Sequence, residues 1–403
     1  MASVCFYFQI HQPCRLRRYS VFDTGTDYFD TPRNAEICRR VASRCYLPAN
    51  KLMLALIRRW EGRFRIAYSL TGVLLDQLQQ HAPQVLDSFR ELNETGCVEF
   101  LAETYHHTLS FLYSRPEFDE QVGLHLKRIE GLFGCRPTVF RNTELIYNND
   151  LALYVQNMGF RVVLAEGADQ ILRGRSPNYP YRAPNAPGVT VLLRNYNLSD
   201  DIAFRFANRE WVEYPLTAEK FARWVNQVNG NGYTVNLFID YETLGEHQWA
   251  DSGIFDFLER LPGEVLKHRD NDFKTPSEVA AACPAGGDYD VPHMISWADT
   301  ERDLSAWLGN AMQSNALHEL YRLEGDVRAC GDPQVLEDWR RMQTSDHLYY
   351  MCTKHWADGA VHDYFNPYES PYDSYINFMN VLDNLRRRAG ARPQRRPQIA
   401  TKA

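Results

Sequence analysis

Short apolar runs alternate with amphipathic segments along the chain as far as residue 291. Runs rich in Val, Ile, Phe and Tyr predict strands, and apolar residues repeated every three or four positions predict helices. The predicted strands are residues 4–10, 64–69, 98–100, 139–140, 162–164, 189–193, 235–239 and 289–291. The predicted helices between them include residues 51–60, 74–92, 119–133, 150–158 and 218–228.

Strands that alternate with helices predict a mainly parallel sheet, and a right-handed repeat of this length favours closure into a barrel. After Asp299 the strand pattern stops, and residues 304–323, 333–351 and 372–388 all predict helices. We therefore expect an α/β fold in which a barrel catalytic domain (1–295) precedes a helical bundle (296–388) that completes the active site. Residues 389–403 are expected to form a basic, disordered tail.

Charge and cysteine usage exclude several classes of protein. The formal net charge is -7, whereas a nucleic-acid partner requires a basic face. The nine cysteines are scattered without a Cys-x-x-Cys pair, as in the reduced thiols of a cytoplasmic enzyme. The N-terminus reads as a strand, not a signal peptide, and no apolar stretch is long enough to predict a membrane span. The oligomeric state stays open.

Polar and titratable residues follow several predicted strands. In parallel α/β folds the carboxyl ends of the strands are where ligands bind. These residues are His11 after the first strand, Glu99 with Glu103, Tyr105, His106 and His107 around the third, Arg141 to Glu144 after the fourth, and Asp240, Glu242 and His247 after residues 235–239. Further candidates in the helical part are Trp297, Asp346, His347, Tyr349 and Tyr350.

Two of these carboxylates, Glu144 and Asp240, match the requirement of glycoside hydrolysis. One must be ionised to attack the anomeric carbon, and the other must be protonated to release the leaving oxygen. Spacing alone leaves a metal site or a structural role equally open for Asp240.

The order of the motifs along the chain indicates a protein family, which the spacing of single residues does not. The segments His11-Gln12-Pro13, Gly96 to Glu99, Arg141 to Glu144, Asp240 to His247 and Ser345-Asp346-His347 resemble the five sequence regions of glycoside hydrolase family 57, above all its α-amylase group. The resemblance implies an incomplete (β/α)7 barrel followed by a helical domain. It also implies retaining cleavage or transfer of α-glucosidic bonds in an α-glucan or maltooligosaccharide, without a metal or other cofactor.

The resemblance also implies roles for individual residues. Glu144 resembles the nucleophile and Asp240 the general acid/base, whereas His11, Glu99 and Asp346 resemble residues that hold the substrate near the cleaved bond. The further candidates for the substrate pocket are Tyr105, His106, His107, Glu242, His247, Trp297, Tyr349 and Tyr350.

Three alternatives remain open at this stage. A 4-α-glucanotransferase or glucan-branching enzyme would use the same chemistry, with a sugar hydroxyl in place of water. A metal-dependent sugar deacetylase or zinc mannosidase would use His11, His106, His107, Asp240 and His247 as ligands. A non-catalytic glucan-binding protein would keep the pocket without turnover. The sequence does not fix the preferred glucan length or branching.

Overall fold

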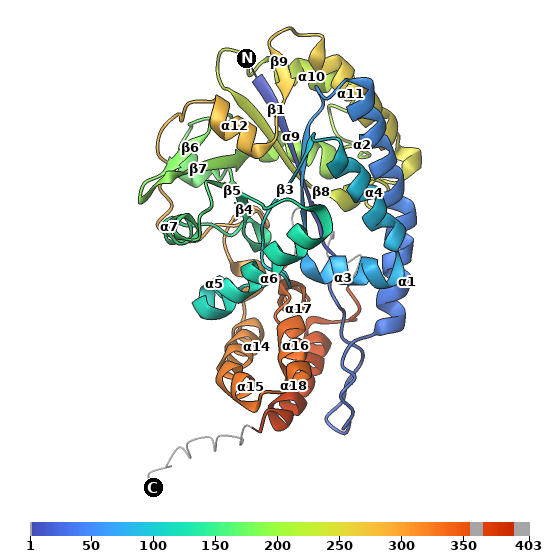
Figure 1. The fold of residues 1–403 in the computed structure, drawn as a ribbon, viewed down its shortest axis with the longest axis vertical. Helices are drawn as coiled ribbons and strands as arrows, with labels where there is room; N and C mark the ends of the chain where they lie inside the picture. Colours follow the sequence, from blue (N-terminus) through green and yellow to red (C-terminus); the bar gives the residue numbers. More distant parts are fainter. Residues whose placement is uncertain (1, 355–365, 391–403) are drawn as a thin grey trace.

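The computed structural model describes residues 2–354 and 366–390 of the 403-residue chain. Two sheets lie at its centre with helices packed around them (Figure 1). The first has the order β3-β2-β1-β8, with β9 also paired to β1, and the second has the order β4-β5-β7-β6. All pairs are parallel except β6 with β7. The strands are β1 (Ala2–Ile10), β2 (Ile66–Leu70), β3 (Val98–Phe100), β4 (Val139–Arg141), β5 (Val162–Glu166), β6 (Tyr181–Ala183), β7 (Ala186–Arg194), β8 (Thr234–Asp240) and β9 (Asn271–Phe273).

The two sheets enclose a common interior. Every residue of β1 is buried, as expected of a parallel strand covered on both faces. The backbone of Ala102, just after β3, bonds to both Val139 and Arg141 of β4, and Asn195 after β7 donates to Asn236 of β8. One apolar cluster in this interior takes side chains from strands of both sheets. The carboxyl ends of the strands therefore converge on one site.

The helices cover the outer faces of the sheets and then gather below them. Figure 1 shows α14 to α18, in orange and red, as a group beneath the strands. The α-helices are α1 (Thr31–Val41), α2 (Leu47–Arg59), α3 (Gly72–His81), α4 (Pro83–Glu94), α5 (Ser110–Tyr113), α6 (Arg115–Phe133), α7 (Asn149–Asn157), α8 (Asp169–Leu172), α9 (Tyr196–Ala203), α10 (Ala218–Asn226), α11 (Ile254–Leu266), α12 (Pro276–Ala282), α13 (Ser305–Leu308), α14 (Ala311–Arg322), α15 (Glu324–Cys330), α16 (Pro333–Met342), α17 (Ser345–Tyr349) and α18 (Pro371–Arg388). Among the described residues, the short π or 3-10 segments are η1 (Ala42–Tyr46), η2 (Thr143–Leu145), η3 (Tyr241–Thr243) and η4 (Ala250–Ser252).

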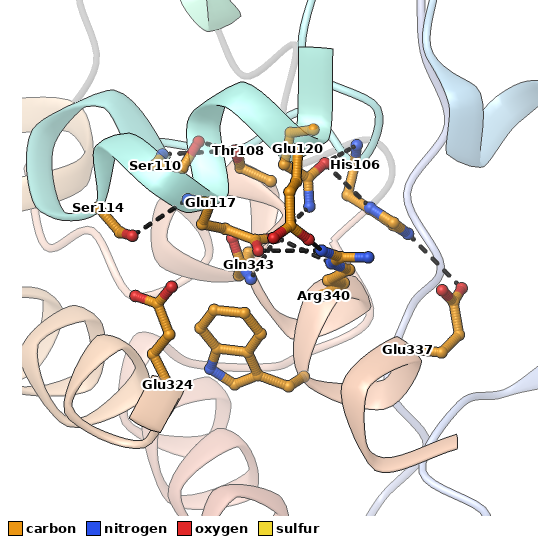
Figure 2. Close-up of polar contacts among 12 residues, drawn as sticks. His106, Thr108, Ser110, Ser114, Glu117, Glu120, Glu324, Glu337, Arg340 and Gln343 are labelled. Carbon is orange, nitrogen blue, oxygen red and sulfur yellow. Dashed lines mark hydrogen bonds and ion pairs between the residues drawn. The ribbon is translucent and has the colours of Figure 1, made fainter. Parts of the chain in front are cut away.

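The buried carboxylate of Glu117 connects α6 to two of these lower helices, α15 and α16. The side chain of Glu117 is fully buried and accepts hydrogen bonds from Arg340 at 3.0 Å and Arg328 at 2.6 Å. Gln343 also donates to it at 3.3 Å (Figure 2), and so does Gln121 at 2.7 Å. A buried charge is tolerated only when it is paired in this way. These contacts fix α15 and α16 against α6.

Most predicted elements are confirmed, with shifted ends. The strand predicted at residues 289–291 is wrong: Tyr289 donates to the backbone of Arg182 but forms no strand of its own. The single helices predicted over residues 74–92, 304–323 and 333–351 are also wrong, because each is divided in two. Pro83 begins α4 after α3, Asn310 caps α14 after α13, and α17 follows α16 after a break at residues 343–344. The strands β6 and β9 were not predicted. Of the expected tail, residues 389 and 390 follow α18, and residues 391–403 lie outside the described part.

Candidate active site

A pocket of about 610 Å³ opens where β1, β4 and β8 end. Its wall combines residues from these strand ends with others from the segment after residue 295 and from α17. The lining residues are Gln9, His11, Gln12, Pro13, Arg15, His107, Glu144, Asp240, Glu242, His247, Trp297, Asp346 and Tyr350.

Glu144 is held in one orientation by three donors. It lies in η2 directly after β4, is 7% exposed, and has φ 58°, a left-handed conformation that is unfavourable for a non-glycine residue. One carboxylate oxygen, Oε1, contacts His107 Nε2 at 3.0 Å and accepts from Ser345 Oγ at 3.3 Å. The other, Oε2, accepts from Trp297 Nε1 at 2.7 Å. The donors favour an ionised carboxylate at this position.

His107 lies between two buried carboxylates. Its Nδ1 contacts Glu103 at 3.2 Å, and its Nε2 contacts Glu144. Burial alone would lower the pKa of His107, but the hydrogen bonds to Glu103 and Glu144 raise it to about 9. Glu103 is fully buried and also accepts a hydrogen bond from Ser69. Burial opposes its ionisation, yet the bond to His107 and the charge of Arg141 lower the pKa of Glu103 to about 2. The ring is therefore an imidazolium that donates to both carboxylates.

Asp240 and Glu242 form a close acidic pair at the end of β8. Asp240 is the last residue of the strand, and Glu242 follows in η3 with 4% exposure. The hydroxyl of Tyr46 donates to Glu242 at 2.5 Å. Burial and the negative charge of Asp240 raise the pKa of Glu242 to about 8. Near neutral pH the pair therefore holds a proton, a requirement for acid catalysis.

His11 connects the strand end to the lower helices. Its Nδ1 contacts Thr71 Oγ1 and its Nε2 contacts Asp346 Oδ2, both at 2.9 Å. Its ring stacks on the ring of His107 with 4.1 Å between centroids. Burial and the charge of His107 lower the pKa of His11, so a neutral ring faces the imidazolium.

Trp297 is supported by arginines behind the pocket. The guanidinium groups of Arg141 and Arg194 lie 5.1 and 5.6 Å from its ring centroid, within the range of cation–π attraction. Arg302 donates to its backbone carbonyl at 2.5 Å. Because Trp297 donates to Glu144, these arginines indirectly fix the position of that carboxylate.

The structure brings together nine of the thirteen residues expected at the site. Four others lie outside the pocket lining. Glu99 accepts from the backbone of Ser277 at 3.0 Å, at the start of α12, and Tyr105 donates to Asp76. His106 lines a separate pocket, and Tyr349 packs near Trp307. The nine that line the pocket are His11, His107, Glu144, Asp240, Glu242, His247, Trp297, Asp346 and Tyr350.

Other contributors were not among the expected site residues. Gln9 and Arg15 line the pocket, while Glu103 and Ser345 contact His107 and Glu144 from behind. A signal for Gln9 existed, because side chains alternate along a strand and Gln9 shares the inward face with His11. Glu103 was named with the polar residues after the third strand but was given no role, because its partners Gln9 and Ser69 lie on two other strands.

Across residues 2–354 and 366–390, no group of three or more His, Cys, Asp or Glu side chains is arranged to hold a metal ion. Within the same ranges, none of the helices has the length and apolar character needed to cross a membrane.

Comparison with known proteins defines the class of the molecule as a glycoside hydrolase. More particularly, the chain belongs to glycosyl hydrolase family 57, whose model matches residues 5–292. A relative from Methanocaldococcus jannaschii, named "Putative alpha-amylase", is 42% identical over 393 residues, which cover 94% of this chain and 83% of the relative.

Solved structures of low sequence identity share the fold. The 4-alpha-glucanotransferase from Thermococcus litoralis has a TM-score of 0.70 at 14% identity, and the match covers 98% of this chain and 61% of the glucanotransferase chain. The present chain thus spans less than two thirds of that enzyme's length. The branching enzyme from Pyrococcus horikoshii has a TM-score of 0.67 at 14% identity, and the match covers 96% of this chain and 94% of the branching enzyme. The α-amylase AmyC from Thermotoga maritima has a TM-score of 0.62 at 16% identity, and the match covers 95% of this chain and 93% of AmyC.

Proposed function

We propose that this glycoside hydrolase cleaves α-1,4-glucosidic bonds of glucans with retention of configuration. Glu144 is the nucleophile and Asp240 the general acid/base of this proposal. The observation that carries it is the Glu144 carboxylate, fixed by His107, Trp297 and Ser345 in the same pocket as Asp240. The α-amylase name of the 42% identical relative supports the substrate class.

The reaction proceeds in two displacements. In the first, a Glu144 oxygen forms a bond to the anomeric carbon while the glycosidic C–O bond breaks and Asp240 transfers its proton to the departing oxygen. In the second, Asp240 removes a proton from water, whose oxygen attacks the anomeric carbon and breaks the ester to Glu144. His107 and Trp297 stabilise the negative charge on Glu144 before attack and after release.

We also propose the finer architecture that the site requires. The strands β1, β2, β3, β4, β5, β7 and β8 form an incomplete (β/α)7 barrel within residues 1–295, which is supported by the contacts of Ala102 with β4 and of Asn195 with β8. Residues 296–388 form a helical domain that supplies Trp297, Asp346 and Tyr350 to the pocket. An α-glucan chain then binds between the two domains.

Substitution of each acid tests the roles separately. Glu144→Ala and Asp240→Ala are each expected to abolish turnover of maltoheptaose with an unchanged circular dichroism spectrum, and Glu94→Ala, an exposed carboxylate elsewhere, serves as the control. Azide added to an activated aryl glucoside should occupy the space of the missing carboxylate. It is expected to yield a glycosyl azide of inverted configuration with Glu144→Ala and of retained configuration with Asp240→Ala. Retained activity in either variant would refute the role given to that residue.

Product analysis separates hydrolysis from transfer. We expect the wild-type protein to convert maltoheptaose only into shorter oligosaccharides. Products longer than maltoheptaose would show that a sugar hydroxyl, not water, resolves the intermediate.

A further inference from the structure

The segment between β1 and α1 forms an arm that packs along the last helix. Within this arm (residues 16–29), Leu16 pairs with Phe29 as an antiparallel bridge, and the backbone N–H of Arg17 donates to the carbonyl of Tyr28 at 2.9 Å. Figure 1 shows the dark blue arm reaching below the sheets beside α18. The arm is therefore a paired hairpin that lies against the helical part of the molecule.

A closed turn at the tip of the arm holds two apolar side chains in solvent. The backbone N–H of Asp23 donates to the carbonyl of Ser20 at 3.1 Å, and the Asp23 carboxylate accepts from the Ser20 backbone N–H and hydroxyl, both at 2.7 Å. Val21 and Phe22 fill the two corner positions, and Phe22 is 90% exposed. Polar residues and glycine are usual at such corners. Two apolar residues on a fixed turn break this rule while gaining little burial, which is typical of a binding site.

A hollow lies between the arm and α18, next to this turn. Its volume is about 900 Å³, and its wall includes Ser20 and Asp23 of the turn and Ile376 of the helix. Hydrogen bonds fix its shape, because the side-chain amides of Asn377 and Asn380 donate to backbone carbonyls of the arm at 3.0 and 3.1 Å. The hollow is thus preformed, and its amide donors already serve the fold, which disfavours a sugar as its ligand.

Apolar surface continues from the turn onto α18. Tyr372 and Ile376, four positions apart on one helix face, are both exposed. Ile376 and the turn border the same hollow, so the apolar side chains of both elements form one patch. With Val21 and Phe22 included, this patch exposes roughly 500 Å² of apolar surface, as much as the patches that mark interaction sites on soluble proteins.

The charges around the hollow exclude some classes of partner. Among its described lining residues, Arg18 is the one basic side chain, whereas Asp23, Glu369 and Asp373 are acidic. An acidic rim repels a polyanion or an anionic membrane surface. The rim still carries both signs, because Arg18 and Glu369 form an exposed ion pair at 3.3 Å. A partner with the same mixture of charges and apolar surface fits it.

We propose that this patch joins two copies of the chain into a symmetric dimer. The protruding Val21–Phe22 turn and the hollow lie side by side on one surface, so a twofold axis places the turn of each copy in the hollow of the other. Arg18 of each copy then lies at the acidic rim of its partner, which pairs opposite charges twice. The two patches bury roughly 1,000 Å² of apolar surface, and their polar rims bring the interface into the range of stable dimers.

Sedimentation tests the dimer with a matched pair of variants. Phe22→Asp places a charge in the interface, whereas Val212→Asp makes the same kind of change at another apolar side chain that is 90% exposed, between α9 and α10. At about 100 µM protein, we expect the wild type and Val212→Asp to sediment as dimers and Phe22→Asp as a monomer, all with the same circular dichroism spectrum. A monomeric wild type, or a dimer that persists in Phe22→Asp, overturns the proposal.

Cross-linking tests where the two copies touch. A Phe22→Cys protein mixed with an Ile376→Cys protein is expected to form a disulfide-linked pair, because the two substitutions are on different copies. A mixture of Val212→Cys with Ile376→Cys should show only the background from the native cysteines, and equal cross-linking in both mixtures overturns the proposal. A monomeric wild type that binds glycogen through Phe22 would instead assign the patch to glucan. Because dimer formation needs no turnover, these outcomes stand apart from the test of glucan cleavage.

Discussion

Removal of the charge on Glu103 should shift the pH dependence of catalysis. The variant Glu103→Gln keeps an acceptor for the Nδ1–H of His107 but removes one of the two anions that keep this ring protonated. The pKa of His107 is about 9 in the folded protein, against an ordinary value of 6.5. That difference corresponds to about 3 kcal/mol of preference for the protonated ring.

Because the pKa of His107 is raised in the folded protein, its contribution to stability decreases as the pH rises. The stabilisation from His107 is complete below pH 6.5 and is lost as the pH rises through about 9. In Glu103→Gln the buried charge of Arg141 remains without its carboxylate partner, 3.8 Å away, and repels a proton on His107. We expect a loss of roughly 3–5 kcal/mol in the free energy of unfolding at pH 7, as is usual when one member of a buried ion pair is removed.

The value of kcat should also depend on the protonation of His107. A neutral His107 donates from only one nitrogen, so Glu144 or Glu103 loses a donor and the nucleophile is less firmly held. In the Glu242→Gln variant, which lacks the alkaline limb near 8, we expect kcat on maltoheptaose to fall as the pH rises through about 9, and the added Glu103→Gln change to move that limb toward 6.5.

Two variants control this measurement of kcat from pH 5 to 10. Glu242, with a pKa of about 8, is a second source of an alkaline limb, and Glu242→Gln removes it. Glu103→Asp keeps the charge and should leave the limb near that of the wild type. An unmoved limb in a folded Glu103→Gln protein would refute the reasoning.

Three further predictions concern the supports of the site. Trp297→Phe removes the hydrogen bond to Glu144, so we expect kcat to fall roughly 10- to 100-fold with little change in KM in initial-rate assays, and an equal rise in KM would contradict a positioning role. Glu117→Gln leaves Arg340 with a weaker buried partner and should destabilise the fold by roughly 3–5 kcal/mol in calorimetry, far more than Glu120→Gln at the half-exposed neighbour. Activity on maltoheptaose should survive EDTA, and a loss restored by zinc would favour a metal-dependent reaction instead.

The sequence predicts the strands well because their burial is local information. A run such as that of β8 is apolar whatever its neighbours are, and its end at Asp240 follows from the change to polar residues. How deep in the sheet a residue lies depends on the neighbouring strands, so it cannot be read from the residue's own segment. Glu99 pairs with Ala67 inside the sheet, and its carboxylate accepts from the start of α12, so its motif alone did not locate it.

Contacts between distant segments also escaped prediction. Glu103 contacts Ser69 and Gln9 as well as its near neighbour His107, and only the register of β1, β2 and β3 brings the first two side chains to it. Sequence spacing contains no record of that register, because each strand can slide by two residues and keep its apolar face. The sequence named Glu144 and Asp240, and also His107, Trp297 and Ser345, but it did not predict that the last three contact the carboxylate of Glu144.

The contact between His11 and Asp346 has a consequence for biosynthesis. These residues are 335 positions apart, yet their side chains meet at 2.9 Å in the pocket wall. During translation His11, Glu144 and Asp240 leave the ribosome well before Asp346 is made, and domains fold in order from the N-terminus. A nascent chain therefore carries both acids without a finished pocket. We expect a product that ends before Asp346 to be inactive toward glucan, because it lacks part of the pocket wall.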